Sequence, residues 1–366
     1  MTHFAFTGNG ILNDADISSL VEGEAIRFDC PPDEDQIQPA SLDLRLGNKA
    51  YRVRASFLPG PDQTVKGKLD DLQLHQIDLT KGAVLETGCV YIVPLMESLS
   101  LPPMIEAAAN PKSSTGRLDI FTRVICDNTR QFDTIPSGYS GPLFLEISPR
   151  TFPVLVRAGS RLSQIRFRIG RAQLSDPEHL LLHREESLVF SPEDPFIDNG
   201  IAISIDLAGE GIIGYRAKRH SAVIDVDVRD GLDMLDFWEP IEGRGKNALI
   251  LDPDKFYILV SREAVHVPPL YAAEMVPFDP LMGEFRVHYA GFFDPGFGAS
   301  EAGGKGSRAV LEVRSHEVPF IVEHGQLIGR LAYERMRARP SRLYGAGIGS
   351  NYQAQGLKLS KHFRMA

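Results

Sequence analysis

The sequence repeats itself at a nearly constant interval, and this repeat restricts the possible folds more than any other feature. In the second half of the chain, residues identical to those in the first half recur 166 positions later: Tyr91-Ile92 and Tyr257-Ile258, Pro102-Pro103 and Pro268-Pro269, Leu145-Glu146 and Leu311-Glu312, Pro153 and Pro319, Gly159 and Gly325. Farther upstream, SLDL at 41–44 matches SIDL at 204–207 at an interval of 163. Such regularity indicates a duplicated domain, and the alternative is two unrelated domains with similar turns.

Short strand-like runs separated by Gly, Pro and Asp fill both halves, for example CVYIVPL at 89–95 and KFYILV at 255–260. These runs predict a mainly β chain with antiparallel strands rather than alternating βαβ units. Residues 10–30 have helix-like spacing of apolar residues, and residues 176–190 indicate a polar helical or irregular connector. The predicted parts are an N-terminal helical leader (1–29), a first repeat (30–175), a connector (176–195) and a second repeat (196–366).

The chain of 366 residues has a formal net charge of −9 and a pI of about 5.6. This acidic balance argues against binding a nucleic-acid polymer, but a small anionic ligand remains possible because a pocket's local charge can oppose the net charge. The three cysteines form no CxxC pair, so we expect a reduced, cytoplasmic environment and no structural zinc. The sequence contains neither an apolar run long enough to span a membrane nor a secretory signal.

A candidate anion site follows the proline pair of the first repeat, in NPKSSTGR at 110–117. Ser113 and Ser114 offer hydroxyl groups, and Arg117 and Lys112 offer positive charge. Together with backbone N–H groups at a glycine-containing turn, they resemble a cradle for phosphate oxygens. The alternative is a polar turn with a surface arginine. The second repeat reads DPLMG at the same interval and lacks this cradle.

A candidate proton-transfer group lies in the second repeat, where Glu312 stands between apolar neighbours in a strand after the hairpin VHYAGFFDPGFG. If its side chain faces a pocket, burial would suit it to proton transfer near neutral pH, and the alternative is that it points to solvent. Asp294 lies in the hairpin turn. The first repeat has Glu146 at the matching position but a longer, irregular hairpin. We therefore expect a composite site that takes its cradle from one copy and its carboxylates from the other.

These motifs, in this order, resemble those of the deoxycytidine triphosphate deaminase and trimeric dUTPase superfamily. The resemblance is carried by QPASLDLRLGNKAYRVRA (38–55), SSTGR (113–117), VHYAGFFDPGF followed by VLEV, GQLIGRLAYERM (325–336) and LYGAGIGSNYQAQGLKLSKHF (343–363). It implies two tandem dUTPase-like domains, each a distorted β-barrel or jelly roll of the β-clip type with short helices. The deaminases of this superfamily carry a glutamate where this chain has Glu312, whereas pure dUTPases normally do not.

The resemblance implies that Glu312 is the general acid/base that activates water for attack on cytosine C4. It implies no zinc, and the sequence has an HxE at His183 and Glu185 but no PCxxC, so we expect these two residues on the connector surface. Magnesium would enter bound to the triphosphate.

The resemblance also implies the substrate-binding residues. Lys112, Ser113, Ser114 and Arg117 would bind phosphate, His288, Tyr289 and Ala290 would lie along the base edge, Asp294 would meet the deoxyribose or organise the hairpin, and Tyr344, Gln355 and Lys358 would close the tail over the nucleotide. Three departures from the family pattern stand out: Lys112 replaces an arginine, Asn351 replaces the tail lysine, and residues 298–308 form a glycine-rich insertion.

The implied activity is hydrolysis of dCTP to dUTP and ammonia in pyrimidine deoxynucleotide synthesis. One alternative is a bifunctional enzyme that releases dUMP, or a dUTPase. Another is a nucleotide-binding regulator without catalysis. The resemblance further implies a homo-oligomer and inhibition by thymidine triphosphate.

Overall fold

The described part of the chain folds into two compact units. The first unit contains residues 1–172 and 222–231, and the second contains residues 173–221 and 232–366. The computed structural model describes residues 6–191, 193–245, 247–277, 285–287, 291–299, 306–315, 317–345 and 356–364.

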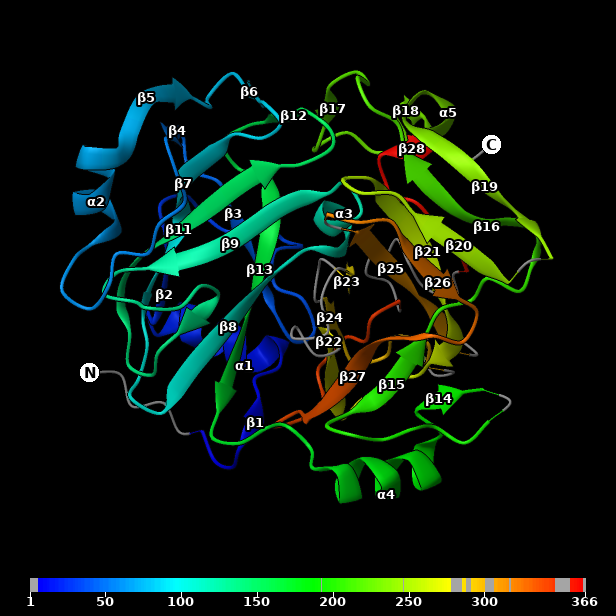
Figure 1. Cartoon of the computed structure of the whole chain (residues 1–366). Helices are drawn as coiled ribbons and strands as arrows, with labels where there is room; N and C mark the ends of the chain where they lie inside the picture. Colours follow the sequence, from blue (N-terminus) through cyan, green and yellow to red (C-terminus); the bar gives the residue numbers. More distant parts are fainter. Residues whose placement is uncertain are drawn as a thin grey trace. The chain divides into compact units, whose positions relative to one another are not determined.

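The first unit is built from three sheets (Figure 1). The largest has, in order, β5 (Gln73–Asp78), β4 (Lys49–Val53), β7 (Val90–Ser100), β11 (Ser140–Pro149) and β9 (Ile120–Cys126), and β2 (Ile26–Phe28) also pairs with β7. The second has β1 (Gly10–Ile11), β13 (Arg161–Ile169), β8 (Ile105–Pro111) and β10 (Thr134–Ile135), and β3 (Leu42–Arg45) also pairs with β13. The third has β17 (Ile224–Asp225), β12 (Val154–Val156) and β6 (Ala83–Leu85).

The second unit is built from two large sheets and two small ones (Figure 1). The largest has β19 (Trp238–Arg244), β16 (Glu210–Ala217), β21 (Phe256–Val265), β25 (Ser307–Ser315) and β23 (Phe285–Val287), and β14 (Val189–Phe190) also pairs with β21. The next has β15 (Ile201–Ser204), β27 (Leu327–Arg335), β22 (Tyr271–Pro277) and β24 (Phe292–Phe293). The small sheets are β20 (Ala248–Leu251) with β26 (Phe320–Glu323), and β18 (Leu232–Asp233) with β28 (Phe363–Arg364).

The two units have the same strand order. The run β5-β4-β7-β11-β9 of the first corresponds to β19-β16-β21-β25-β23 of the second, and β13-β8-β10 corresponds to β27-β22-β24. The pairs β12-β6 and β26-β20 correspond as well. This agreement confirms the prediction of a mainly β chain with two tandem copies of one fold and short helices.

One part of the predicted repeat is wrong. Strand pairing places Leu42 opposite Ile165 and Ile201 opposite Leu331. Because Ile165 and Leu331 correspond at the 166 interval, Leu42 corresponds to Ile201, an interval of 159, and not to Ile205. The SLDL and SIDL sequences therefore lie four residues out of register, and their similarity reflects only the shared alternation of apolar residues in strands.

Two helices occupy equivalent places in the two units. α1 (Asp14–Glu22) begins after a capping box at Asn13 and ends at Gly23, so it fills only the middle of the helix predicted over residues 10–30. The ends of that range form β1 and β2 instead. α4 (Asp176–Glu186) begins after an equivalent capping box at Ser175, and both helices lead into a short strand that pairs with the long central strand, β7 or β21.

Three shorter helices, α2 (Val65–Leu72), α3 (Ser113–Gly116) and α5 (Met234–Phe237), are not predicted from the sequence. Four to eight residues are too few for helical periodicity to be read. None of the helices in the described part of the chain is long and apolar enough to cross a membrane.

A short arm from the second half of the sequence, residues 222–231, belongs to the first unit. Its strand β17 pairs in parallel with β12. Arg157 Nη1 lies 2.7 Å from a carboxylate oxygen of Asp225 and 3.2 Å from one of Asp227. The strand-like run AVIDVDV at 222–228 forms a ladder only at Ile224–Asp225.

The core of the second unit lies between its two large sheets. Side chains from β21 and β25 pack there against side chains from β15, β22 and β27. Leu311 and Val313 of β25 belong to this core. Because successive side chains of a strand point to opposite faces, Glu312 lies on the other face of the sheet.

Candidate active site

The predicted phosphate cradle lies on one helical turn in the first unit. α3 follows β8 directly, and the carbonyl of Lys112 accepts two N–H groups of the turn at 2.8 and 3.0 Å. Ser113 is exposed, whereas Ser114 is 6% and Arg117 3% exposed. The alternative of a surface arginine is therefore wrong. The four side chains of the motif start from one turn, which is an arrangement suited to several oxygens of one phosphate chain.

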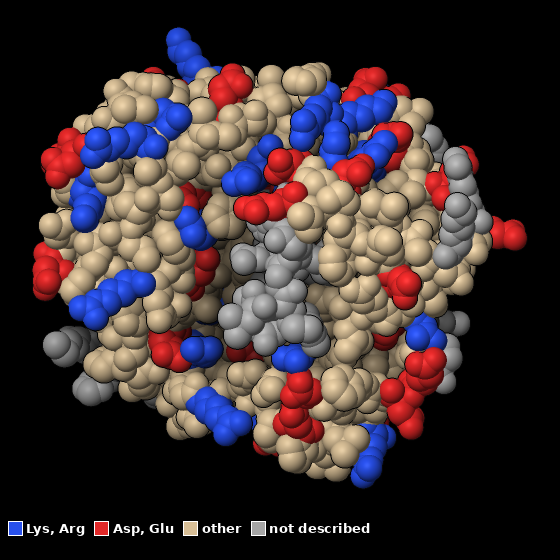
Figure 2. Space-filling model, viewed as in Figure 1, with Lys and Arg blue, Asp and Glu red and all other residues tan. Residues whose placement is uncertain are grey.

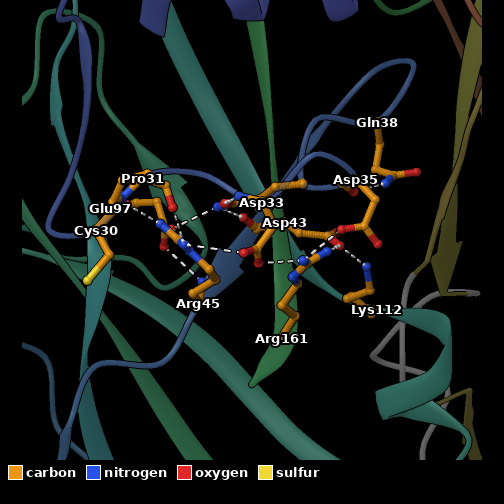
Figure 3. Close-up of polar contacts among 11 residues, drawn as sticks. Cys30, Pro31, Asp33, Asp35, Gln38, Asp43, Arg45, Glu97, Lys112 and Arg161 are labelled. Atoms are coloured by element: carbon orange, nitrogen blue, oxygen red, sulfur yellow. Dashed lines mark hydrogen bonds and ion pairs between the residues drawn. The ribbon is translucent and has the colours of Figure 1, made fainter. Parts of the chain in front are cut away.

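The side chain of Lys112 is already in an ion pair. Its Nζ bonds Oδ2 of Asp43 on β3, a carboxylate that is 2% exposed (Figure 3). Arg161 on β13 lies on the same oxygen, with Nη1 at 3.5 Å. Two cations thus share one buried carboxylate directly beside the cradle.

Arg161 is held from its other side by two more exposed carboxylates (Figure 3). Its Nη2 donates to Asp33 and, at 2.8 Å, to Asp35. The hydrogen bond from Arg161 holds the pKa of Asp35 below its usual value. Burial alone would lower the pKa of Arg161, but its hydrogen bonds to Asp35 and Asp33 outweigh burial and raise it. Neither Asp43 nor Arg161 is predicted from the sequence, although an aspartate between two buried leucines of a strand breaks the apolar pattern.

Glu312 stands in the middle of β25, opposite Ile258 of β21. Its side chain is 6% exposed, so the alternative in which it points to solvent is wrong. Arg314, two residues farther on the same face, is 5% exposed and donates through Nη1 to the carbonyl of Asp254 at 3.0 Å. A carboxyl group enclosed in this way can exchange a proton with a bound ligand without competition from bulk water.

Asp294 and Tyr344 are brought together at one turn of the second unit. Asp294 follows β24 and is 9% exposed, and the N–H of Tyr344 donates to the carbonyl of Pro295 at 2.8 Å. The rings of Tyr344 and Phe297 have centroids 5.7 Å apart. Gly296 has a φ of +96°, and a Cβ there would lie 2.8 Å from the residue before Tyr344, so only glycine allows this contact.

Residues 359–364 at the C-terminal end of the described chain pack on the second unit. β28 pairs in parallel with β18, and the ring of Phe363 packs 5.3 Å from that of Phe237. Phe363 is 2% exposed, so this pairing and ring packing hold the chain that follows Lys358. Several predicted residues lie outside the described residues: His288, Tyr289, Ala290, Asn351, Gln355 and residues 300–305 of the glycine-rich insertion.

Glu146, the counterpart of Glu312, is 1% exposed and is bound by an arginine of its own unit. Arg123 on the neighbouring strand β9 donates to its Oε1 through Nε at 3.0 Å and Nη2 at 2.5 Å. The guanidinium carbon of Arg123 lies 3.5 Å from the centroid of the Phe132 ring and 4.7 Å from that of Phe121. The carboxylate is thus neutralised and covered within the first unit.

Two more glutamates, Glu97 and Glu263, are buried. No motif predicts them, although they also lie 166 positions apart. Glu97 accepts the backbone N–H of Arg45 at 2.8 Å, its Nε at 2.9 Å and the amide of Gln36 at 2.8 Å. Glu263 accepts the N–H of Ser204 at 2.8 Å and its hydroxyl at 2.5 Å. Burial raises the pKa of Glu97 despite these donors. Each carboxylate ties β3 or β15 to the long central strand.

The described residues contain no group of three or more His, Cys, Asp and Glu side chains placed to hold a metal ion. His183 and Glu185 lie on α4, with Glu185 exposed, and burial lowers the pKa of His183. On the face shown in Figure 2, the described Lys and Arg side chains are interspersed with Asp and Glu. A mixed surface of this kind does not form the continuous basic stripe typical of polymer binding.

Comparison with protein-family models gives two matches that together span most of the chain. Residues 8–171 match the N-terminal domain of 2'-deoxycytidine 5'-triphosphate deaminase, and residues 175–363 match its C-terminal domain.

Individual relatives agree. The chain is 30% identical over 175 residues to the dCTP deaminase of Alteromonas mediterranea, covering 45% of this chain and 85% of that protein. It is 30% identical over 159 residues to the dUMP-forming dCTP deaminase of Dictyoglomus thermophilum, covering 43% of this chain and 79% of that protein. The crystal structure of 2'-deoxycytidine 5'-triphosphate deaminase from Agrobacterium tumefaciens is similar with a TM-score of 0.89 and 67% identity, covering 94% of this chain and 100% of that one.

Proposed function

Because the chain belongs to the 2'-deoxycytidine 5'-triphosphate deaminase family, we propose that it hydrolyses dCTP to dUTP and ammonia with Glu312 as the general acid/base. The observation that carries this proposal is the burial of Glu312, which is 6% exposed in the centre of a strand. Its counterpart Glu146 is neutralised by Arg123 and is not assigned a catalytic role.

In the proposed reaction, the ionised carboxylate of Glu312 accepts a proton from water as the oxygen attacks C4 of cytosine. The proton passes to N3, which leaves a tetrahedral carbon. A second proton from the attacking hydroxyl is delivered through Glu312 to the amino group, the C4–N4 bond breaks, and ammonia leaves. One carboxyl group that cycles between its two forms is sufficient for these steps, and we propose that no zinc is involved.

We propose that the triphosphate binds at the turn of Ser113, Ser114 and Arg117, with Lys112 beside it. Magnesium would arrive with the nucleotide as part of the substrate. We propose that Asp294 and Tyr344 contact the nucleoside part, since the N–H of Tyr344 is bonded to the carbonyl of Pro295, the residue after Asp294. The composite site predicted from the sequence stays a prediction.

The test is incubation of the pure protein with dCTP and magnesium chloride, followed by chromatography of the nucleotides. We expect conversion of dCTP to dUTP with one equivalent of ammonia, and much slower turnover of CTP and dCMP. Intact dCTP after hours, with dCTP still bound, would instead support the nucleotide-binding regulator.

A second candidate is a bifunctional enzyme that forms dUMP, since relatives named as dUMP-forming match this chain as well as those named dCTP deaminase. Assaying pyrophosphate release in the same reaction separates the two, because deamination alone releases none. Inhibition by thymidine triphosphate and assembly into a homo-oligomer remain further proposals, to be checked by adding the nucleotide to the assay and by light scattering.

A further inference from the structure

We propose that Lys112 exchanges its ion pair with Asp43 for one with the substrate triphosphate when the nucleotide binds. Arg161 stays paired with Asp43 and keeps its charge neutralised, which allows Lys112 to leave. Arg161 and Asp43 are then positioning residues for phosphate binding, outside the cradle itself. The proposal rests on the proposed function, because it takes the nucleotide triphosphate as the ligand of Lys112.

Asp43 is a buried carboxylate with two cations on one oxygen. Its side chain is 2% exposed, and Oδ2 meets both Lys112 Nζ and, at 3.5 Å, Arg161 Nη1 (Figure 3). A buried carboxylate without a cation is strongly destabilising, whereas a carboxylate with two cations keeps a partner when one leaves. The second cation therefore makes departure of the first possible at low cost.

The two cations on Asp43 are held by different numbers of carboxylates. Arg161 is fixed by Asp33 and Asp35 as well as by Asp43, and its planar guanidinium fits these carboxylates in one orientation (Figure 3). In the described part of the chain, Lys112 has one ion-pair partner, Asp43, and its ammonium group ends a flexible four-carbon stem. Lys112 also directly precedes Ser113 and Ser114, the first residues of the cradle. Lys112 is therefore the cation that can turn toward a phosphate.

Arg161 should therefore determine whether Lys112 can leave Asp43. Without Arg161, movement of Lys112 to the triphosphate would leave Asp43 buried and unpaired, so Lys112 would stay on Asp43 and phosphate affinity would fall. When the charges of Asp43 and Arg161 are both removed, no carboxylate at position 43 competes with the phosphate for Lys112. The effects of Asp43 and Arg161 on nucleotide affinity should therefore be opposite in sign and coupled.

The experiment measures the dissociation constant of magnesium dCTP by calorimetry, in the Glu312→Gln background so that no turnover occurs. The variants are Arg161→Gln, Asp43→Asn and the double variant. Arg168→Gln is the matched control, since Arg168 lies on the same strand and pairs with Glu106 at 2.6 Å. Melting temperatures report folding, and initial rates with Glu312 intact test the activity separately.

We expect Arg161→Gln to weaken dCTP binding about tenfold, and the double variant to return to within about threefold of the parent. Asp43→Asn alone should bind dCTP as tightly as the parent or more tightly, and Arg168→Gln should change nothing. A folded Arg161→Gln protein with unchanged affinity, or a folded double variant without recovery, overturns the proposal. If Arg161→Gln does not fold, weaker binding by Asp43→Asn overturns it.

Failure of the proposed function gives a different pattern. In that case the parent neither binds dCTP nor converts it when Glu312 is present. If the parent binds and converts dCTP but the double variant does not recover the affinity lost in Arg161→Gln, only the proposed exchange of Lys112 between Asp43 and phosphate fails.

Discussion

Glu146 and Glu312 occupy the same position in the two copies of the fold, yet their surroundings differ. Glu146 shares two hydrogen bonds with Arg123, whose guanidinium lies against Phe132. The same sheet in the first unit is covered by an apolar cluster that includes Phe144, Phe57 and Leu58. Glu312 lies two residues before Arg314 on the same face of β25, and Nη1 of Arg314 is bonded to a backbone carbonyl.

The difference teaches that a carboxylate at an equivalent strand position acquires its chemistry from its neighbours. The guanidinium of Arg123 occupies the positions around Oε1 of Glu146 that a ligand would need. Glu146 is therefore part of the packing of the first unit, whereas the turn from Lys112 to Arg117 in the same unit is its predicted phosphate cradle. Substitutions in both copies distinguish the packing role of Glu146 from the proposed catalytic role of Glu312.

The largest expected effect separates the two glutamates directly. Glu312→Gln removes the proposed proton carrier and should lower kcat for dCTP about 10³-fold, within the range of general acid–base contributions. Glu146→Gln keeps a hydrogen-bond acceptor for Arg123 and should change kcat less than about threefold. Steady-state rates on dCTP measure both. A severe loss for Glu146→Gln with activity left in Glu312→Gln would reverse the assignment.

The buried pair Glu97 and Glu263 offers a comparison on stability. Glu97→Gln removes the buried carboxylate at 2.9 Å from the guanidinium of Arg45, which is 4% exposed, and leaves only the more exposed Asp33 at 3.9 Å, so it should cost about 3 kcal/mol in the free energy of unfolding. Glu263→Gln keeps one acceptor oxygen, so it loses one of the two hydrogen bonds that Ser204 donates and should cost about 1–2 kcal/mol. Urea unfolding of both variants measures the difference. Equal losses of unfolding free energy would show that the ion pair with Arg45 adds nothing to the cost of replacing Glu97.

The cradle is expected to be sensitive to geometry as well as to charge. Arg117→Lys keeps a cation but removes the planar fork, and should raise KM for dCTP about tenfold with a smaller change in kcat. Arg130→Lys, at an exposed position of the first unit, is the control and should leave KM unchanged. A KM for Arg117→Lys equal to that of the parent would remove Arg117 from the phosphate site.

The architecture is largely predictable from the sequence because duplication leaves an interval that survives in strand residues such as Tyr91 and Tyr257. The register of β3 is not, since an alternating strand looks the same four residues away, as the false match of Leu42 with Ile205 shows. The network around Asp43 also escapes prediction. Asp43 and Arg161 are far apart in sequence, and the pairing of β3 with β13 brings them together.

Individual roles are harder to predict than positions. The pairing of Glu146 with Arg123 depends on a cross-strand register between β11 and β9 that no motif encodes. The burial of Arg117 likewise arises from the packing of α3 against its unit, because the same SSTGR sequence on an open loop would be exposed. Motifs therefore indicate which residues can do chemistry, while their partners decide which of them are available.

The smallest expected effect concerns the two capped helices and pH. Ile17 in α1 and His179 in α4 both lie four residues after the helix cap and are both 0% exposed. Burial lowers the pKa of His179, whose Nε2 accepts the N–H of Tyr333 at 3.0 Å and so requires the neutral ring.

Because the folded pKa of His179 lies below the unfolded value of 6.5, its contribution to stability is complete above pH 6.5. As the pH falls below that value, the unfolded chain takes up the proton first, so the free energy of unfolding decreases until the pH passes the folded pKa. His183, whose pKa burial also lowers, contributes in the same direction. His179→Leu should therefore flatten part of this decrease between pH 7.5 and about 5, whereas His75→Gln, at an exposed position of the first unit, should not. Urea unfolding across this range measures the slope, and an identical slope for His179→Leu and the parent would show that His179 is charged or paired equally in both states.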